Sequence, residues 1–481
     1  MKIRRISESF INRFSIVPPY SLSPYLDVDD LITLRRTHSF FVSGQLCRIA
    51  SPIIHADSSI TGLISFDALS RQFPKAKWLI TLNGIIRIEN STRLTNITSL
   101  DLTNCFELDA PIPLMTNLTS LCLDKSQIII KTEILNTLTK LLSLNLNNYS
   151  QIHGSTLKKL TSLRNLNLDN NTTITDLDIE SLPIQSLSLV YNNTITPSIF
   201  KKLPLTQLNI NCYPLLTEEI LQCTTLTDLT LDRITLNSIN EALLIKITNL
   251  KKLTINHLCT MLIDPLKYLT NLTYLELQSI IGDVEISSLR LLETLIIKGT
   301  SPRLNFPSTP LDNLSHLEIS SYAYKLNFPF LKNLTTLDMG SGWLCGNRER
   351  IELKYLKKLI LREVRYCSYI DISGLNFLTS LDILNCAVDT FVRQGALFAN
   401  DTLQSLSVSS FYWNLDDSSL AGVPNLKYFY LDTFSYGGSK MNSSCFKDLE
   451  NLFRLEGRKH NLSKECIASL KKKGIMIRYI P

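Results

Sequence analysis

Leucine and other apolar residues recur along most of this chain in one pattern, L-x-x-L-x-L, in which x is usually polar. Seventeen units follow it at steps of 20 to 26 residues, and a degenerate eighteenth begins near Ala76. Apolar and polar residues alternate in L-x-L, which predicts a short strand that turns its leucines to one side. The first apolar position falls at 97, 118, 141, 163, 184, 205, 226, 250, 272, 292, 314, 334, 356, 378, 403, 426 and 452.

A single strand of this kind has no core of its own, so the pattern predicts a stack of strands. Neighbouring strands bury their leucines as a continuous ladder, and such an array is stabilised by contacts between successive units. The segments between the strands show few helical patterns, and we expect irregular turns or short helical stretches on the convex side. The predicted fold is an α/β solenoid with short parallel strands on its concave face, over residues 76–462.

The period and the phrase, as in LTNLTYLEL at 269–277, resemble those of the leucine-rich repeat family over roughly residues 76–481. In that family an Asn usually follows three residues after the second strand leucine, where its amide satisfies backbone groups of the turn. Only Asn171 and Asn192 hold that position here, so we expect an irregular array. Other residues at that position include Cys105, Ile234, Leu258, Ile280, Val364, Cys386, Phe411 and Phe434, while Asn104, Asn148, Asn170 and Asn385 stand one position earlier.

The last residues predict a cap, which a solenoid needs to cover its final open edge. Ser463 is placed to cap a helix through Glu465 and Leu470 to Lys473, and Gly474 is placed to end it. Residues 475–477 are predicted to form a last strand, so the C-terminal cap spans 463–481.

Charge and composition change this picture little. Lys and Arg number 49 against 43 Asp and Glu, and the net charge of +6 over 481 residues does not indicate a nucleic-acid partner. We expect no secretory signal and no membrane association, because no apolar run is long enough. The eleven cysteines are scattered without a CxxC pair, which favours reduced, packed thiols in the cytoplasm or the nucleus.

Residues 1–50 lie outside the repeat and predict a separate helical module. An acidic turn at residues 27–30 supplies an N-cap with negative charge at the positive end of a helix. Two small helices joined at this turn are expected, and residues 51–75 are expected to be a linker or an N-terminal cap. Apolar residues on either side of the turn are Leu22, Tyr25, Leu26, Leu31, Leu34 and Phe41.

The run at 17–41, VPPYSLSPYLDVDDLITLRRTHSFF, resembles an F-box. That motif has an early Pro, a Tyr-Leu-Asp turn, then Asp-Leu, spaced leucines and a terminal aromatic residue. The resemblance implies docking on the Skp adaptor of a cullin ubiquitin ligase through residues 17–42, with the repeats choosing the substrate. The residues that would dock are Pro18, Leu22, Tyr25, Leu26, Asp30, Leu31, Leu34 and Phe41.

A second interpretation assigns the same leucines to packing. Pro24 interrupts the helix that an F-box has before its turn, and residues 1–75 would instead cap the first repeats. The protein would then be a stand-alone leucine-rich repeat scaffold. The two hypotheses differ in whether Leu26, Leu31 and Leu34 are buried by the first repeats or by another protein.

No combination of residues in the sequence indicates an enzyme. The six histidines lack zinc-ligand spacing, and the glycines within 340–346 lack the spacing of a phosphate-binding loop. The segment at 122–124, Cys-Leu-Asp, has the Cys-x-Asp shape of some bacterial ligases that carry repeats, but it lies inside a repeat strand. We therefore expect a non-catalytic protein without a cofactor or a metal.

The concave surface is the remaining candidate for function, and its outward residues are larger in the second half of the chain. Aromatic residues and Arg dominate binding hot spots, because they bury much area at little entropic cost. The sequence therefore predicts a site for a protein partner over residues 356–458. Its candidate residues are Arg362, Tyr412, Trp413, Tyr428, Tyr430, Asp432 and Arg458.

Overall fold

The structure, a computed structural model, divides into two units, Met1–Asp232 and Arg233–Pro481, which are described separately. The residues it describes are 53–57, 78–82, 85–86, 97–105, 107–108, 115–211, 218–232, 245–256, 264–279, 282–299, 302–305, 311–320, 331–340, 349–350, 353–363, 370–372, 374–385, 400–410, 420–433, 443–458 and 462–479. The eight predicted adaptor-docking residues, Pro18 to Phe41, lie outside these ranges, as do Tyr412 and Trp413.

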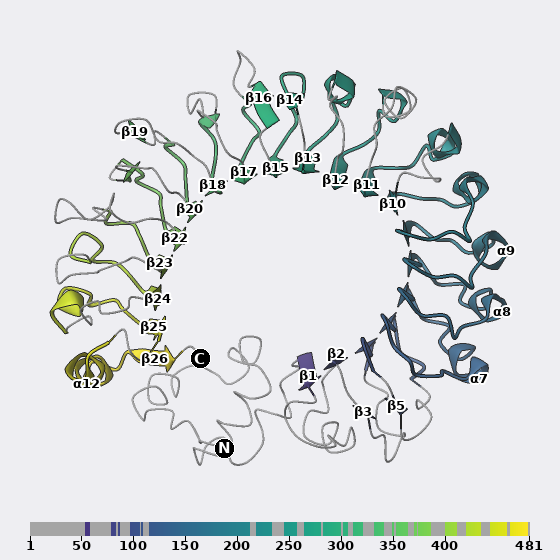
Figure 1. The fold of residues 1–481 in the computed structure, drawn as a ribbon, viewed down its shortest axis with the longest axis horizontal. Helices are drawn as coiled ribbons and strands as arrows, with labels where there is room; N and C mark the ends of the chain where they lie inside the picture. Colours follow the sequence, from purple (N-terminus) through teal and green to yellow (C-terminus); the bar gives the residue numbers. More distant parts are fainter. Residues whose placement is uncertain are drawn as a thin grey trace. The chain divides into compact units, whose positions relative to one another are not determined.

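In the first unit, short parallel strands form a ladder in which each described strand pairs with the next (Figure 1). The register aligns the leucines, so Leu100 lies opposite Leu121 and Leu144 lies opposite Leu166. The strands are β1 (Ile53–Asp57), β2 (Trp78–Leu82), β4 (Ser99–Asp101), β6 (Ser120–Cys122), β7 (Ser143–Asn145), β8 (Asn165–Asn167), β9 (Ser186–Leu189), β10 (Gln207–Asn211) and β11 (Asp228–Asp232).

The outer side of the first unit carries short elements, opposite the strand ladder (Figure 1). They are a two-residue parallel pair and single helical turns, as expected for connections too short for full helices. The elements are β3 (Ile85–Ile86) with β5 (Glu107–Leu108), α7 (Thr132–Leu135), α8 (Gly154–Leu157), α9 (Asp176–Ile179), and the 3₁₀ turns η4 (Pro197–Lys201) and η5 (Glu218–Gln222).

The second unit repeats this arrangement with longer strands. Its ladder is again parallel and in register, and Leu317, Leu337 and Leu359 follow one another across three strands. The strands are β12 (Lys252–Asn256), β13 (Tyr274–Gln278), β15 (Thr294–Lys298), β17 (His316–Ser320), β18 (Thr336–Met339), β20 (Lys358–Arg362), β22 (Ser380–Leu384), β23 (Ser405–Ser410), β24 (Tyr428–Thr433), β25 (Arg454–Gly457) and β26 (Met476–Tyr479).

The outer elements of the second unit include two further parallel strand pairs, which sequence patterns did not predict. They are β14 (Gly282–Glu285) with β16 (Pro302–Asn305) and β19 (Glu349–Arg350) with β21 (Ile370–Asp371). The helical elements are η6 (Asp264–Tyr268), η9 (Ser443–Phe446) and α12 (Lys464–Lys472). No helix among the described residues is long and apolar enough to cross a bilayer.

The core is the predicted leucine ladder. Leu337, Leu359 and their counterparts in the described units are almost completely buried, and each of the seventeen predicted units has its strand. The degenerate eighteenth unit is β2, and β1, which lies in the segment at 51–75, adds a further strand ahead of it. The chain is therefore an α/β solenoid whose strands form one layer and whose connections form the other.

The C-terminal elements agree with the sequence. Ser463 caps α12, its side chain accepting a hydrogen bond from the backbone N–H of Cys466 at 3.0 Å. Gly474, with φ of 76°, follows the helix, and β26 then pairs with β25. This last strand continues the ladder, and α12 supplies the apolar side chains of Cys466 and Leu470 to the core.

The turns after the strands are held by a ladder of side chains that is only partly asparagine. Asn192, 1% exposed, donates to the carbonyl oxygens of Leu168 at 2.9 Å and Asn171 at 3.0 Å. In earlier units, Tyr149 donates its hydroxyl to the Ile128 carbonyl at 2.6 Å, and Ser126 donates to the Cys105 carbonyl at 3.2 Å. Serine and tyrosine thus replace asparagine at this position, because any donor that reaches the preceding turn can satisfy it.

In several repeats, the residue immediately before this ladder position has a left-handed backbone conformation. Its φ is close to 50° in Asn104, Asn148, Asn170 and Asn385, and asparagine tolerates this region better than most residues. The asparagines that precede the usual ladder position in the sequence are therefore turn formers. At Gly299 the φ is 119°, and a Cβ there would lie 2.6 Å from the Cα of Ser279, so only glycine fits.

We predict that Asn192→Ala lowers the free energy of unfolding by about 2–4 kcal/mol, because it leaves several buried backbone groups without partners. The amides of Thr194 and Ile195, which donate to Asn192, should also exchange faster with deuterium. Asn193→Ala, at an exposed neighbouring site, is the matched control and should change stability by less than about 0.5 kcal/mol. Equal effects of the two substitutions would contradict the ladder role.

We predict a pH-dependent contribution from Tyr149. Burial raises the pKa of Tyr149 from 10.0 to about 12, so the folded state keeps a proton that the unfolded state releases. Its contribution to stability is complete below pH 10 and is lost as the pH rises towards 12. Unfolding of the wild type and of Tyr149→Phe should therefore differ by about 1 kcal/mol at neutral pH, and this advantage should shrink above pH 10. A difference that stays constant across this range would contradict it.

Candidate functional site

The residues between the two strand leucines form a row across the strand face of the second unit. The leucines point into the core, so the central residue of each L-x-L must point to the other face. The pairing register aligns these residues on neighbouring strands, about 4.8 Å apart. From β13 to β26 the row is Glu276, Ile296, Glu318, Asp338, Ile360, Asp382, Ser407, Tyr430, Glu456 and Arg478.

Two carboxylates meet within this row, because Glu318 lies opposite Asp338. Like charges in register destabilise a sheet, and cations two residues further along the strands offset this. Lys298 lies 3.4 Å from Glu276 and 3.5 Å from Glu318. The negative charges of Glu276 and Glu318 are therefore offset by the Lys298 ammonium group between them.

Arg362, a predicted partner-binding residue, forms an ion pair with Asp338 through three hydrogen bonds. Its Nε donates to both oxygens of Asp338 at 2.9 and 3.1 Å, and its Nη2 donates to Oδ2 at 2.7 Å. Asp338 is only 3% exposed, whereas 46% of the Arg362 side chain remains exposed. The hydrogen bonds to Asp338 raise the pKa of Arg362, so the cation is held in a fixed position with one side open.

Four other predicted residues come together on β24 and at the end of β25, and we call them the aromatic patch: Tyr428, Tyr430 and Asp432 on β24, and Arg458 immediately after β25. Asp432 accepts a hydrogen bond from the Arg458 Nε at 2.5 Å. Tyr428 is 47% exposed, and its ring packs edge-on against Phe453 with centroids 6.2 Å apart. Burial raises the pKa of Tyr430, which keeps the phenol neutral. Strands β22 and β23 separate this patch from Arg362.

A second polar cluster lies on β13 and was not predicted from the sequence. Glu276 accepts hydrogen bonds from the Tyr274 hydroxyl at 2.7 Å and from the Gln278 amide at 2.8 Å. Burial alone would raise the pKa of Glu276, but these bonds and the charge of Lys298 outweigh it and lower the pKa. The alternation in YLELQ was the available signal, since it places Tyr274, Glu276 and Gln278 on one face.

The corresponding face of the first unit is mostly neutral. Its central row contains Asn145, Asn167, Ser188 and Asn209. Asp169 extends this face and accepts from the Ser188 hydroxyl and the Val190 N–H, both at 2.7 Å. Burial raises its pKa despite these bonds. These contacts are internal, so the face offers amides and hydroxyls to a partner rather than free charges.

Cys122, in the Cys-x-Asp segment, sits in that row as a structural residue. Burial raises the pKa of its thiol, and its sulfur lies 3.4 Å from both the Thr103 hydroxyl and the Asn145 amide. A nucleophilic cysteine needs a lowered pKa, so this environment does not activate it. The described residues also contain no group of three His, Cys, Asp or Glu side chains placed to hold a metal.

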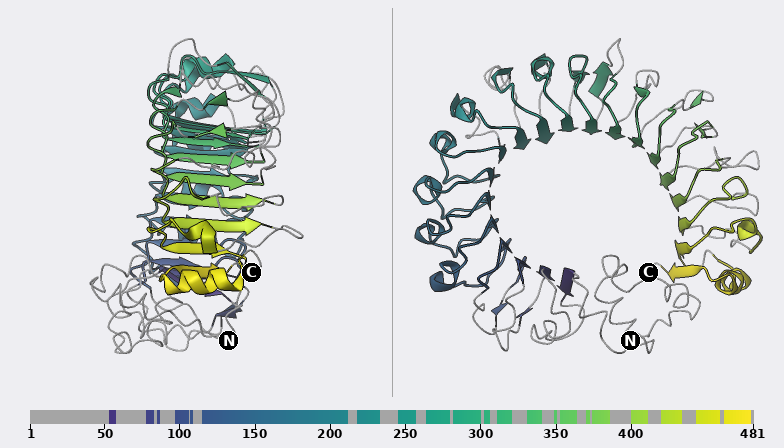
Figure 2. Two further views of the ribbon diagram at one scale, coloured as in Figure 1. Left: turned by 90° about the vertical axis from the view of Figure 1, so that its left-hand side faces the viewer. Right: turned by 180° about the vertical axis from the view of Figure 1, so that it is seen from behind.

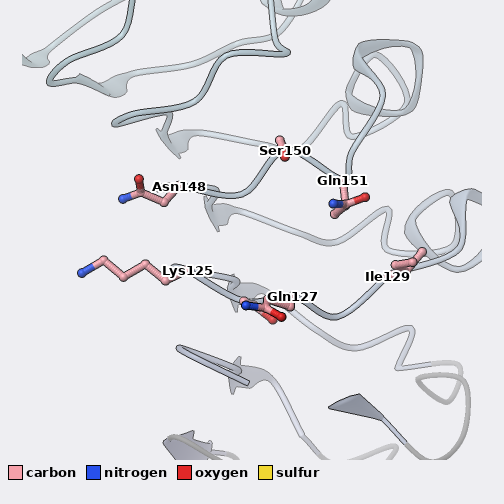
Figure 3. A pocket seen from close by; sticks show the side chains of 7 residues that line it. Lys125, Gln127, Ile129, Asn148, Ser150 and Gln151 are labelled. Carbon is pink, nitrogen blue, oxygen red and sulfur yellow. The ribbon is translucent and has the colours of Figure 1, made fainter. Parts of the chain in front are cut away.

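A shallow depression of about 550 Å³ lies beside the turns after β6 and β7. Figure 3 shows Lys125 and Asn148 extending to the same side, away from Ile129. The only charged group in the lining is Lys125, while Ile129 is 74% exposed. With no pair of titratable groups, the depression is a small polar surface and has no catalytic arrangement.

No model of a known protein family matches the chain, and no curated protein matches its sequence. Several solved structures are similar in fold. The TLR13–ssRNA13 complex is 17% identical over 90% of this chain and 84% of the matched chain, with a TM-score of 0.47. An LRR protein of Leptospira interrogans is 20% identical over 75% of this chain and 96% of its own, with a TM-score of 0.46. The leucine ladder and its register, described above, make this fold an α/β solenoid of the leucine-rich repeat type.

Proposed function

We propose that the protein is a non-catalytic interaction scaffold that captures a protein partner on the strand face of its second unit, over residues 356–458. The observation that carries the proposal is the aromatic patch on β24 and β25. It combines an exposed tyrosine, Tyr428, with a fixed ion pair between Asp432 and Arg458. Aromatic residues and Arg on a rigid sheet can bind with little loss of side-chain entropy.

The charge pattern of this face supports a protein partner rather than a nucleic acid. Binding to phosphates requires a surface with excess positive charge. Here cations lie next to carboxylates of the central row, as Lys358 does at 3.5 Å from Asp382 and Arg478 at 4.0 Å from Glu456. A face of alternating charges with exposed aromatic rings fits the mixed surface of a protein.

We further propose that residues 17–42 dock the protein on a Skp-type adaptor. The support is the F-box-like pattern of Pro18, Tyr25-Leu26-Asp27 and Asp30-Leu31. The protein would then be the substrate-recruiting subunit of a Skp–cullin–F-box ubiquitin ligase in the cytoplasm or the nucleus. The aromatic patch would hold the substrate.

A second candidate function is that of a stand-alone scaffold whose N-terminal segment only caps the solenoid. One observation favours it: Ile53–Asp57 pairs with β2 in parallel register and extends the ladder beyond the repeats. Residues just before the repeats are thus part of the stack, and the preceding leucines could pack there too. The partner surface is the same under both functions.

We predict that Tyr428→Ala weakens capture of protein partners at least tenfold, about 1.4 kcal/mol, because a hot-spot ring is lost. The matched control is Tyr268→Ala, which removes an equally exposed tyrosine, 48% against 47%, from the outer turn η6. Affinity purification with quantitative mass spectrometry measures the set of partners retained by each full-length variant. If both variants lose the same partners, or neither loses any, the patch is not the site.

We predict that the full-length protein co-purifies with a Skp adaptor and that Leu26→Asp with Leu31→Asp abolishes this, because charges replace the apolar contact. The control is Tyr428→Ala, which should leave adaptor binding unchanged. Equal adaptor binding by the Leu26, Leu31 variant and the parent contradicts the docking role. Adaptor binding that is lost together with the thermal stability of the repeats would instead favour the cap.

A further inference from the structure

A second ladder of asparagines runs along the start edge of the strands in the second unit. In the repeats that have one, the asparagine stands immediately before the first leucine. Each side-chain amide donates to a backbone carbonyl of the preceding unit, and this bond links the units at the edge where the strands begin. The bonds are Asn271 to Thr248 at 2.9 Å, Asn313 to Arg290 at 2.8 Å, Asn333 to Asp312 at 2.8 Å and Asn425 to Asp401 at 2.7 Å.

Two adjacent units replace this asparagine with aromatic residues, Tyr355 and Phe377. They precede β20 and β22, which are neighbours in the ladder. The two rings lie with centroids 6.0 Å apart, and Tyr355 and Phe377 are 44% and 49% exposed. Figure 2, left, shows that the strands of this unit run parallel, so the residues that precede them lie along one edge.

This replacement does not favour folding. Neither aromatic side chain can donate the amide hydrogen bond of the ladder, and each residue keeps almost half of its surface exposed. A single exposed apolar residue, such as Leu291 at the same position in another unit, is ordinary. A contacting pair in successive units forms a contiguous patch, and such patches mark interaction sites.

The charges beside this pair are positive. Lys354 and Lys357 are exposed, and Lys354 Nζ lies 5.5 Å from the Tyr355 ring centroid. Other lysines of the unit lie in ion pairs, Lys332 with Asp312 at 2.9 Å and Lys358 with Asp382 at 3.5 Å. Within the described residues, neither Lys354 nor Lys357 has a carboxylate partner.

We propose that Lys354, Tyr355, Lys357 and Phe377 form an edge docking site for an acidic segment of a partner protein. The segment carries an aromatic or aliphatic side chain next to its carboxylates. The apolar side chain covers the two rings, and the carboxylates pair with the two lysines, whose charge they complement. This site is separate from the aromatic patch, and its existence does not depend on the function proposed above.

The test uses the full-length protein and fluorescein-labelled ten-residue peptides. The first peptide has six Glu or Asp around a central Phe-Leu pair, the second replaces that pair with Ser-Ser, and the third replaces the acids with Lys. We expect the first peptide to bind, by fluorescence anisotropy, at least tenfold more tightly than the other two. Its affinity should fall with added salt, because screening weakens exposed charge pairs.

The decisive variant is Tyr355→Asn with Phe377→Asn, since it restores the residue that the ladder uses elsewhere. It should fold with unchanged or higher thermal stability and bind the first peptide at least tenfold more weakly. Lys354→Gln with Lys357→Gln should weaken binding and flatten its salt dependence, and Tyr268→Ala should do neither. The proposal is overturned if the first peptide does not bind, if the asparagine variant binds as well as the parent, or if that variant is less stable.

Discussion

Burial of leucines between successive strands is the constraint on which the rest of this structure depends. A strand of three to six residues cannot cover its own apolar side chains, so each strand needs a neighbour in the same register. Leu317, Leu337 and Leu359 show the result, since all three are fully buried. Because strand side chains alternate, this register also fixes the residues between the leucines as rows on the opposite face. The proposed partner surface therefore results from the same register that packs the core.

Because the packing of the leucines sets the register, it also places charged side chains of neighbouring strands next to one another, whatever their sign. Glu318 and Asp338 are forced opposite each other, and the burial of Asp338 makes its charge costly without a partner. Arg362 and Lys298 offset these charges from the next row along the strands. Compensation of this kind leaves Arg362 rigid and half exposed, which is the state that a contact residue for a partner requires.

The two ends of the strands are joined to their neighbours by different means. After many of the strands, a left-handed residue turns the chain, and a donor such as Asn192 or Tyr149 satisfies the preceding turn. Before several strands of the second unit, the side-chain amide of an asparagine such as Asn333 donates to a backbone carbonyl of the preceding repeat. Both ladders tolerate substitution, but with different results. The buried Tyr149 still donates a hydrogen bond to the preceding turn. The exposed Tyr355 and Phe377 do not donate the amide bond of the asparagine ladder, and their rings form an exposed apolar pair instead.

The sequence alone determined the fold class, the repeat units and the helical cap after Ser463, because these depend on periodicity and local residue type. It also predicted by phase that Arg362, Tyr428, Tyr430, Asp432 and Arg458 lie on the strand face, where the structure has them. It could not show that Asp338 would be buried beneath Arg362, or that Glu276 would contact both Tyr274 and Lys298. Nor could it show that Ser126 and Tyr149 would make the turn hydrogen bond that asparagine makes elsewhere. Those contacts join residues about twenty positions apart, and only the stacking of units, which sets the distance between neighbouring side chains, decides which of them meet.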